Sequence, residues 1–377
     1  MSNIRKTALA AIFCGTLLGT SVLDVAVAGP KFLYTLHNNQ ALRGFAITSP
    51  TGALTPLSGS PWIVPEFPFL LGMGKGPAGK FLYPVTPDSS VTSGFAVNAT
   101  TGALTPVPGS PFAFPPSGVA MTVHPSGKFA YMNAIAYDIS PFIVNPTTGA
   151  LTASGNVATG GVYPRLAIEP NGKCLYSLNK GIFFINDPAK TKNISAFTIN
   201  QTSGALTEIA GSPFPTGANP VFFTFHPTGK YLIVSSNGST DIRTYAIDPG
   251  TCALTQKAVL TNATGDVAFE PTGHFVYATS GGTRRTIATL TFNATTGTLT
   301  RSSTVSTGKL TASLLAMDPA GKFVIAVESN LSSTTTSPIQ AVSYAINATT
   351  GALTPASGPI TLDGDSPVED LSISGAP

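Results

Sequence analysis

Apolar and polar residues alternate in short runs along this chain, and no segment sustains an apolar repeat of 3.6 residues. Val119–His124 (VAMTVH) and Lys128–Ala134 (KFAYMNA) are two such runs, separated by a Pro-Ser-Gly turn, and Ser93–Asn98 (SGFAVN) is another. Alternation over roughly four to eight residues is typical of half-buried β-strands, whereas helices need the longer period. The pattern predicts an all-β protein of short strands.

Two turn phrases recur between these runs. The phrase NATTGALTP occurs at Asn98 and again at Asn347, and looser copies begin at Ser49, Asn145, Asn200, Asp248 and Asn293. A Pro-x-Gly phrase follows the residues Gly76, His124, Glu169, His226, Glu270 and Asp318. Asn or Asp side chains accept hydrogen bonds from the turn backbone, and Gly adopts the positive φ without steric cost. Both phrases therefore predict tight hairpin turns, with Cys252 replacing the Gly in one copy.

The turns repeat with a period of about 50 residues, and each period holds four short strands, which is typical of a propeller blade. The chain has seven Thr-Gly-type turns but six Pro-x-Gly turns. The segment from Lys31 reads as the second strand of a blade, and Pro367–Ser374 reads as a first strand without its turn. We therefore predict a seven-bladed β-propeller over residues 29–377, with four-stranded antiparallel blades. Pairing of the C-terminal strand with the N-terminal blade closes the ring.

Antiparallel order also assigns the loops to two faces. If the strands of a blade are named a to d from the channel outward, the a–b and c–d turns share one face and repeat closely. The b–c and d–a loops share the other face and vary in length and chemistry. Variable loops on a rigid scaffold are where binding residues concentrate, so a site is expected on the variable face.

The charge composition and the N-terminal segment indicate which partners are excluded and where the protein is expected to be located. Only 10% of residues are charged, the formal net charge is +3, and the Lys and Arg residues are scattered, so no nucleic-acid-binding stripe is present. Residues 1–28 resemble a signal peptide, with Arg5 and Lys6, an apolar run, and Ala26-Val27-Ala28 as a cleavage pattern. A retained membrane anchor is the alternative. We expect a secreted or periplasmic monomer with no membrane span after cleavage.

Cys174 and Cys252 are the two cysteines of the expected mature chain. An oxidising compartment permits a disulfide between them. They lie in different repeats, however, one in a strand and one beside a turn, and both replace ordinary repeat residues. We therefore expect two buried free thiols.

The phrases HPSGKFAYMN, HPTGKYLIVS, NATTGALTP and AGSPF resemble those of the seven-bladed β-propeller lactonase family, which includes 6-phosphogluconolactonase-like propellers and fungal carboxymuconate cyclases. The resemblance covers the whole expected mature chain and implies a lactone hydrolase. Phosphogluconolactone is a cytosolic metabolite, so an exported member would act on another substrate. The family's Pro-Arg-His phrase is matched by Arg165, with Leu166 in the His position. Asn179-Lys180 replaces the following Asn-Glu.

Other candidate residues follow from the repeat. His37 ends a strand before a variable loop, and Glu328 holds the equivalent place in the last repeat. Because ring closure makes these blades neighbours, the two side chains are expected to approach each other and are candidates for proton transfer. The alternative is that both are solvated loop residues. Asp266 occupies the same strand entrance as Arg165, so both are expected to line the channel. Arg284 and Trp62 lie in variable-face loops and are candidate ligand contacts. Packing between blades is the alternative for Trp62.

Two functions remain open at this point. The first is a lactone hydrolase with Arg165 holding an anion and His37 or Glu328 transferring protons. The second is a non-catalytic propeller that binds a small molecule, carbohydrate or lactone, or another surface. The sequence shows no phosphate loop, zinc motif or paired-cysteine motif, so neither metal nor cofactor is expected.

Overall fold

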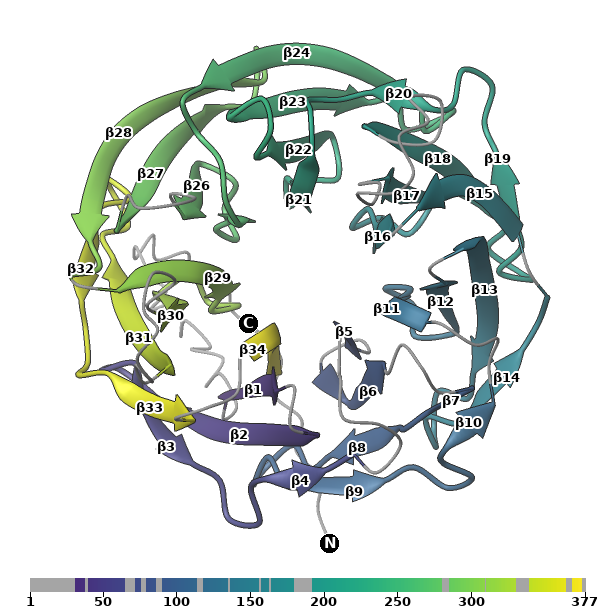
Figure 1. The fold of residues 1–377 in the computed structure, drawn as a ribbon, viewed down its shortest axis with the longest axis horizontal. Helices are drawn as coiled ribbons and strands as arrows, with labels where there is room; N and C mark the ends of the chain where they lie inside the picture. The colour runs from purple at the N-terminus through teal and green to yellow at the C-terminus, as the bar shows by residue number, and fades with distance from the viewer. Residues whose placement is uncertain are drawn as a thin grey trace, which may run out of the picture.

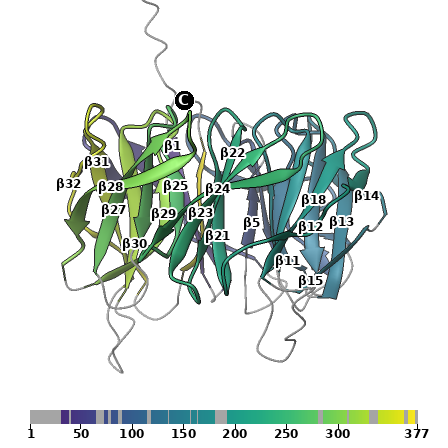
Figure 2. The same ribbon diagram turned by 90° about the horizontal axis from the view of Figure 1, so that it is seen from above.

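The computed structural model describes residues 31–37, 40–64, 72–75, 79–85, 90–113, 118–134, 136–155, 157–162, 164–179, 192–279, 285–308, 310–329, 339–363 and 368–374. Their strands form seven antiparallel blades around a central channel (Figure 1), and the blades stand side by side when the ring is viewed from its edge (Figure 2). The predicted all-β, seven-bladed propeller is confirmed. No helix among these residues is long and apolar enough to cross a membrane. The predicted signal peptide, residues 1–28, lies outside the described residues.

The first four blades contain the following strands, from the channel outward. Blade 1 has β34 (Val368–Ser374), β1 (Lys31–His37), β2 (Ala41–Thr48), β3 (Ala53–Pro56) and β4 (Trp62–Ile63). Blade 2 has β5 (Gly72–Lys75), β6 (Phe81–Val85), β8 (Phe95–Val97) and β9 (Leu104–Pro106), with β7 (Val91–Thr92) pairing β10 (Phe112–Ala113). Blade 3 has β11 (Gly118–Val123), β12 (Phe129–Ala134), β13 (Ala136–Val144), β14 (Leu151–Ala153) and β15 (Val157–Val162). Blade 4 has β16 (Pro164–Ile168), β17 (Cys174–Asn179), β18 (Asn193–Ile199), β19 (Leu206–Glu208) and β20 (Phe214–Pro215).

The remaining three blades follow the same order. Blade 5 has β21 (Pro220–Phe225), β22 (Tyr231–Ser236), β23 (Asp241–Ile247) and β24 (Leu254–Thr261). Blade 6 has β25 (Val267–Phe269), β26 (Phe275–Thr279), β27 (Thr286–Asn293) and β28 (Thr298–Ser306). Blade 7 has β29 (Thr311–Met317), β30 (Phe323–Ser329), β31 (Ile339–Ile346), β32 (Leu353–Pro355) and β33 (Ile360–Asp363). In blades 1, 3, 4 and 7 a fifth segment pairs with strand c, so the outermost strand is interrupted rather than single.

The C-terminal strand completes the N-terminal blade. β34 pairs antiparallel with β1, with Phe32 opposite Ser374 and Leu36 opposite Asp370. This is the pairing expected from the missing Pro-x-Gly turn. It gives the inner edge of β1 a hydrogen-bonded partner.

Neighbouring blades are joined by one repeated contact. The aromatic residue at the start of strand b lies on the positive-φ glycine of the next blade's Thr-Gly turn, and a Cβ built on that glycine would come within 2.4–2.9 Å of the ring. The pairs are Phe32–Gly102, Phe81–Gly149, Phe129–Gly204, Tyr231–Gly297, Phe275–Gly351 and Phe323–Gly52. Glycine is therefore required at these turns for two reasons, the backbone conformation and the close approach of the ring.

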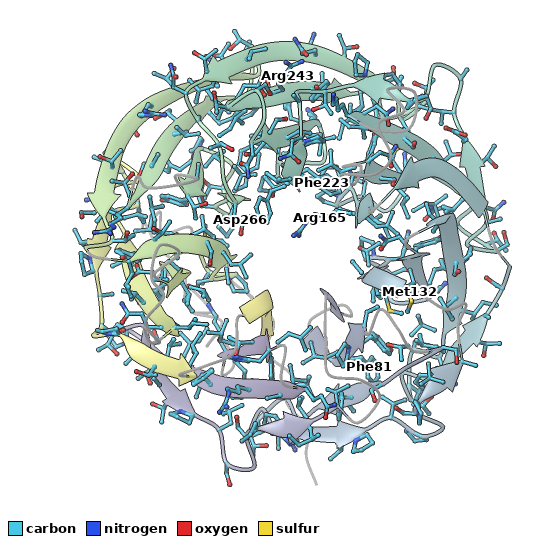
Figure 3. The ribbon with its side chains drawn as sticks, viewed as in Figure 1. Phe81, Met132, Arg165, Phe223, Arg243 and Asp266 are labelled. Carbon is cyan, nitrogen blue, oxygen red and sulfur yellow. A yellow bond between two sulfur atoms is a disulfide. The ribbon has the colours of Figure 1, made fainter. Side chains whose placement is uncertain are left out.

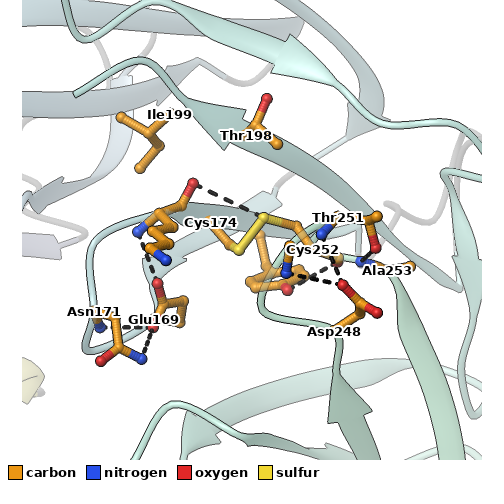
Figure 4. The surroundings of a disulfide bond; sticks show 12 residues. Glu169, Asn171, Cys174, Thr198, Ile199, Asp248, Thr251, Cys252 and Ala253 are labelled. Atoms are coloured by element: carbon orange, nitrogen blue, oxygen red, sulfur yellow. Dashed lines mark hydrogen bonds between the residues drawn. A yellow bond between two sulfur atoms is a disulfide. The ribbon is translucent and has the colours of Figure 1, made fainter. Parts of the chain in front are cut away.

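The junction between blades 4 and 5 uses a disulfide instead. Cys174 stands at the aromatic position and Cys252, with φ 63°, at the glycine position, and their sulfur atoms are bonded at 2.02 Å (Figure 4). The expectation of two free thiols is therefore wrong. The separation in the repeat was misleading, because the start of strand b in one blade always lies against the c–d turn of the next. The two positions that contact at the other junctions are thus the two that became cysteine.

A candidate active site in the central channel

Arg165 projects into the channel from the innermost strand of blade 4 (Figure 3). It is the second residue of β16, opposite Leu178 of β17, and Phe222 holds the equivalent position in blade 5. The guanidinium carbon of Arg165 lies 4.6 Å from the centroid of the Phe222 ring. Stacking of a cation on an aromatic face stabilises its position while leaving the N–H groups at its edge directed toward the cavity.

Asp266 holds the same repeat position in blade 6 and also faces the channel (Figure 3). Its Oδ1 accepts a hydrogen bond from the amide of Val267, and its Oδ2 accepts one from the amide of Leu315 in blade 7, both at 2.8 Å. The backbone amide of Asp266 donates to Thr279 Oγ1 at 2.8 Å. The carboxylate is therefore fixed in orientation and links blades 6 and 7.

Arg165 and Asp266 line one cavity of about 280 Å³. The rest of its wall is mostly apolar: Ala120, Met121, Leu166, Ala167, Phe222, Phe223, Leu314 and Leu315. The sequence-based expectation that both charged residues line the channel is confirmed. One cation and one carboxylate beside apolar side chains can bind and orient a small anionic or strongly polarised group.

Leu166 and Lys180 depart from the family phrase near Arg165, whereas Asn179 matches it. Leu166, in the expected His position, lies in the cavity wall and cannot transfer a proton. Asn179 is buried, its Nδ2 donates to Asn193 Oδ1 at 2.6 Å and Ser195 Oγ at 2.9 Å, and its Oδ1 accepts from Ser177 Oγ at 2.9 Å. Asn179 therefore stabilises the end of blade 4 rather than contacting a ligand. Lys180 lies outside the described residues.

His37 and Glu328 do not approach one another, contrary to the expectation from ring closure. Both are buried strand residues, 0% and 1% exposed, rather than solvated loop residues. Glu328 alternates with Val324 and Ala326, which pack against Phe275 and Tyr277 of blade 6, and it lines a cavity with Ser306 and Thr307 of that blade. His37 alternates with Leu33, which packs against blade 7, and its Nε2 lies 2.8 Å from Thr35 Oγ1. Blade 7 therefore separates the two side chains, and neither lines the cavity of Arg165.

Burial raises the pKa of Glu328 above the usual carboxyl range, and hydrogen bonds from Tyr344 and Gln340 partly offset this effect. The Tyr344 hydroxyl donates to Glu328 Oε1 at 2.5 Å, and the Gln340 amide donates to Oε2 at 3.2 Å. These contacts explain how a carboxyl group is accommodated between two blades. Glu328 is buried and does not line the cavity of Arg165. We therefore expect it to affect the stability of the fold rather than catalysis.

We expect Glu328 to contribute stability that is lost as pH rises above about 4.3, the unfolded carboxyl value. The folded state holds the Glu328 proton more tightly, so it binds more protons than the unfolded state between that pH and the raised folded pKa, and the free energy of unfolding falls across this window. Melting temperatures of the protein and of Glu328→Gln, measured between about pH 4 and pH 8, should differ in slope. Identical slopes would contradict this role of Glu328.

Trp62 is half-buried and packs against the apolar cluster that blades 1 and 2 share. Its ring lies 6.4 Å from that of Tyr34, and it covers Gly44, where a Cβ would come within 2.8 Å of the indole. The packing alternative is therefore the one observed. Arg284 lies outside the described residues, and its predicted role stays a prediction. Phe222, the partner of Arg165, was missed, although aligning the repeats places it at the position of Arg165 in the next blade.

Comparison with known proteins gives a family and a fold. The family model described as lactonase, 7-bladed beta-propeller matches residues 108–213, 166–260 and 253–369, which together exceed half of the chain. A probable 6-phosphogluconolactonase of Arthroderma benhamiae is 29% identical over 101 residues. That alignment covers 26% of this chain and only 24% of the fungal protein.

Solved structures share the whole architecture. A putative 6-phosphogluconolactonase from Bacteroides uniformis superposes with a TM-score of 0.71 at 19% identity, covering 92% of this chain and 99% of that one. The periplasmic gluconolactonase of Pseudomonas aeruginosa gives a TM-score of 0.73 at 14% identity, covering 93% and 99%. At these identities the likeness shows the fold.

Proposed function

Because the chain belongs to the seven-bladed β-propeller lactonase family, we propose that it hydrolyses a lactone in the channel cavity of Arg165. The observation that carries this proposal is the position of the Arg165 guanidinium, stacked on Phe222 and sharing one cavity with the carboxylate of Asp266. The names of the fungal and bacterial relatives, which refer to gluconolactones, support a lactone as the substrate class.

In the proposed reaction, water adds to the lactone carbonyl carbon and the ring C–O bond then breaks. Two parallel N–H groups of Arg165 hold the carbonyl oxygen as it gains negative charge, which lowers the barrier because the charge develops in a largely apolar cavity. The ring oxygen leaves with a proton, and the product is a hydroxy acid whose carboxylate can remain on Arg165.

Asp266 is the proposed general base. Its two amide hydrogen bonds fix the carboxylate, so a water molecule in the cavity would meet an acceptor of constant orientation. The proton removed from water would pass to the departing ring oxygen. Leu166, Phe223 and Leu315 give the cavity apolar surface beside both charged groups.

Arg165→Lys should lower kcat/KM for glucono-δ-lactone by about 10²-fold, since an ammonium cannot form the paired donor geometry and losing one oxyanion donor costs about that much. Initial rates in a pH-stat would measure this. The matched control is Arg285→Lys, an exposed arginine that is absent from the cavity wall. Asp266→Asn should lower kcat and remove the basic group from the pH profile of kcat/KM.

The outcomes separate the two function classes. Hydrolysis that survives both Arg165→Lys and Asp266→Asn would place the active centre elsewhere. If a panel of simple five- and six-membered lactones is hydrolysed no faster than in buffer, the lactonase proposal fails and a binding propeller is the better description.

A further inference from the structure

A second cavity, of about 350 Å³, lies between blades 5 and 6, away from the wall of the channel cavity. The outer strands of these blades, β24 and β28, lie along the top and the upper left of the ring in Figure 1. The cavity exists because blade 6 has small side chains where blade 5 has larger ones. The paired row Ala278, Ala288 and Thr304 crosses β26, β27 and β28 at positions that hold Val234, Arg243 and Val259 in blade 5.

The cavity combines an apolar floor with a hydroxyl-rich rim. Ala278 and Ala288 are 2% and 9% exposed, so their methyl groups form a closed floor. The hydroxyl-bearing residues on the wall are Thr240, Thr264, Thr279, Thr286 and Thr304. An apolar base with hydroxyl groups around it fits a molecule that has C–H groups on one face and hydroxyls around its edge.

Among the residues that the structure describes, Arg301 supplies the positive charge on the wall of this cavity. It is exposed, and its Nη2 donates to the carbonyl of Asn262 at 2.9 Å, which holds the guanidinium across the connection between β24 and β25. The other guanidinium N–H groups can donate to a carboxylate. No Asp, Glu, Lys or His lines this cavity among the described residues, so nothing there neutralises an anion bound to Arg301.

Two residues at the rim have unusual backbone conformations. Thr240 and Asn262 both have positive φ values, 49° and 56°, although neither is glycine. A β-branched threonine in the left-handed region is strained, and strained residues persist where surrounding structure holds them in place. Both belong to the wall of this one cavity.

We infer that the cavity between blades 5 and 6 is a second binding site, for a small polyhydroxylated organic acid. Its carboxylate binds Arg301, its hydroxyls contact the threonines, and its carbon chain lies on Ala278 and Ala288. The volume is within the range of small-molecule sites and matches one sugar-sized acid. The inference does not depend on lactone hydrolysis in the channel.

Isothermal titration with D-gluconate tests the site, with D-glucitol (no carboxylate) and acetate (no hydroxyls) as comparison probes. Gluconate should bind with a Kd of about 1 mM or below, and each comparison probe should bind at least about tenfold more weakly. Arg301→Gln should weaken gluconate at least about tenfold. Ala288→Val should do the same, because it fills the floor with the side chain that blade 7 carries in Val342.

Thr304→Val, which removes an exposed rim hydroxyl at nearly constant volume, is the variant to use if Ala288→Val melts at a lower temperature than the parent. Gluconate binding that is lost in Arg165→Lys and kept in Arg301→Gln would assign the ligand to the channel and overturn the inference. Equal binding of gluconate, glucitol and acetate, or no saturable binding at about 50 mM gluconate, would also overturn it, the second outcome meaning that the cavity holds water only.

Discussion

Deletion of residues 366–377 should prevent folding to a soluble monomer or lower the melting temperature sharply, because it removes β34. That strand pairs with β1 from Phe32 to His37, and its loss exposes the inner edge of a buried strand. An unpaired strand edge inside a ring has no substitute partner within the chain and is a template for pairing between chains. Differential scanning calorimetry with size-exclusion chromatography would measure both consequences.

A shorter truncation provides the matched control. Removing only residues 375–377 leaves every paired residue of β34 and should leave the melting temperature unchanged. A synthetic peptide of residues 366–377, added to the longer truncation, should restore part of the lost stability by strand addition. Unchanged melting of the longer truncation would mean that β34 does not close the ring in solution.

Reduction of the disulfide between Cys174 and Cys252 should lower the free energy of unfolding by about 4.5 kcal/mol, the chain-entropy value for a loop of this length. The two residues are separated by 78 positions, so the bond closes a loop longer than one blade. It also joins the blade that carries Arg165 to the blade that carries Phe222. Urea unfolding with and without reductant would give the difference.

The aromatic–glycine contact at the other six junctions can be introduced at the disulfide position as a second test. Cys174→Phe alone should destabilise the protein, because a ring at this position would meet the Cβ of Cys252, as it would meet a Cβ on the glycines of the other turns. The double substitution Cys174→Phe with Cys252→Gly recreates the usual contact and should recover most of the stability while making it insensitive to reductant. A double variant no more stable than Cys174→Phe alone would contradict the equivalence of the seven junctions.

The same junction shows which information the sequence contained and which was overlooked. Cysteine replaced an aromatic residue in one repeat and a glycine in the next, and those two repeat positions contact at every other junction. Once the phase of the repeat is known, the paired replacement indicates a disulfide without any structure. Considered one residue at a time, the two cysteines looked unrelated.

A buried tyrosine hydroxyl also joins neighbouring blades at one position of the repeat. Tyr34, Tyr83, Tyr131, Tyr176 and Tyr277 donate to the carbonyl of the neighbouring turn at 2.6–2.9 Å. Blades 5 and 7 carry Ile233 and Ile325 in that position, and the hydroxyls of Thr244 and Ser343 in strand c donate to the turn carbonyl instead, at 2.6 and 2.7 Å. The structural requirement is a donor to a buried carbonyl, and different residues meet it.

For the candidate site, the sequence predicted where the charged side chains lie, but it did not predict which residues they contact. Equivalent positions in the repeat placed Arg165 and Asp266 at the channel correctly. The same method put His37 and Glu328 at equivalent places, and that equivalence is why they cannot meet. Equivalent residues of neighbouring blades point in the same rotational direction, so each faces the blade before its own.

The sequence by itself determined the strand pattern, the turns, the number of blades and the phase in which the ring closes. These features depend on local alternation and on turn residues that act within a few positions, and both can be recognised in one chain. The tertiary structure decided what lies between blades: the disulfide, the Phe222 support of Arg165, the burial of Glu328 and the cavity beside Arg301. Such contacts depend on the size and direction of side chains that face each other across two blades. Blade 6 has Ala278 and Ala288 where blade 5 has Val234 and Arg243, and a cavity lies over the two alanines although the strand pattern is the same.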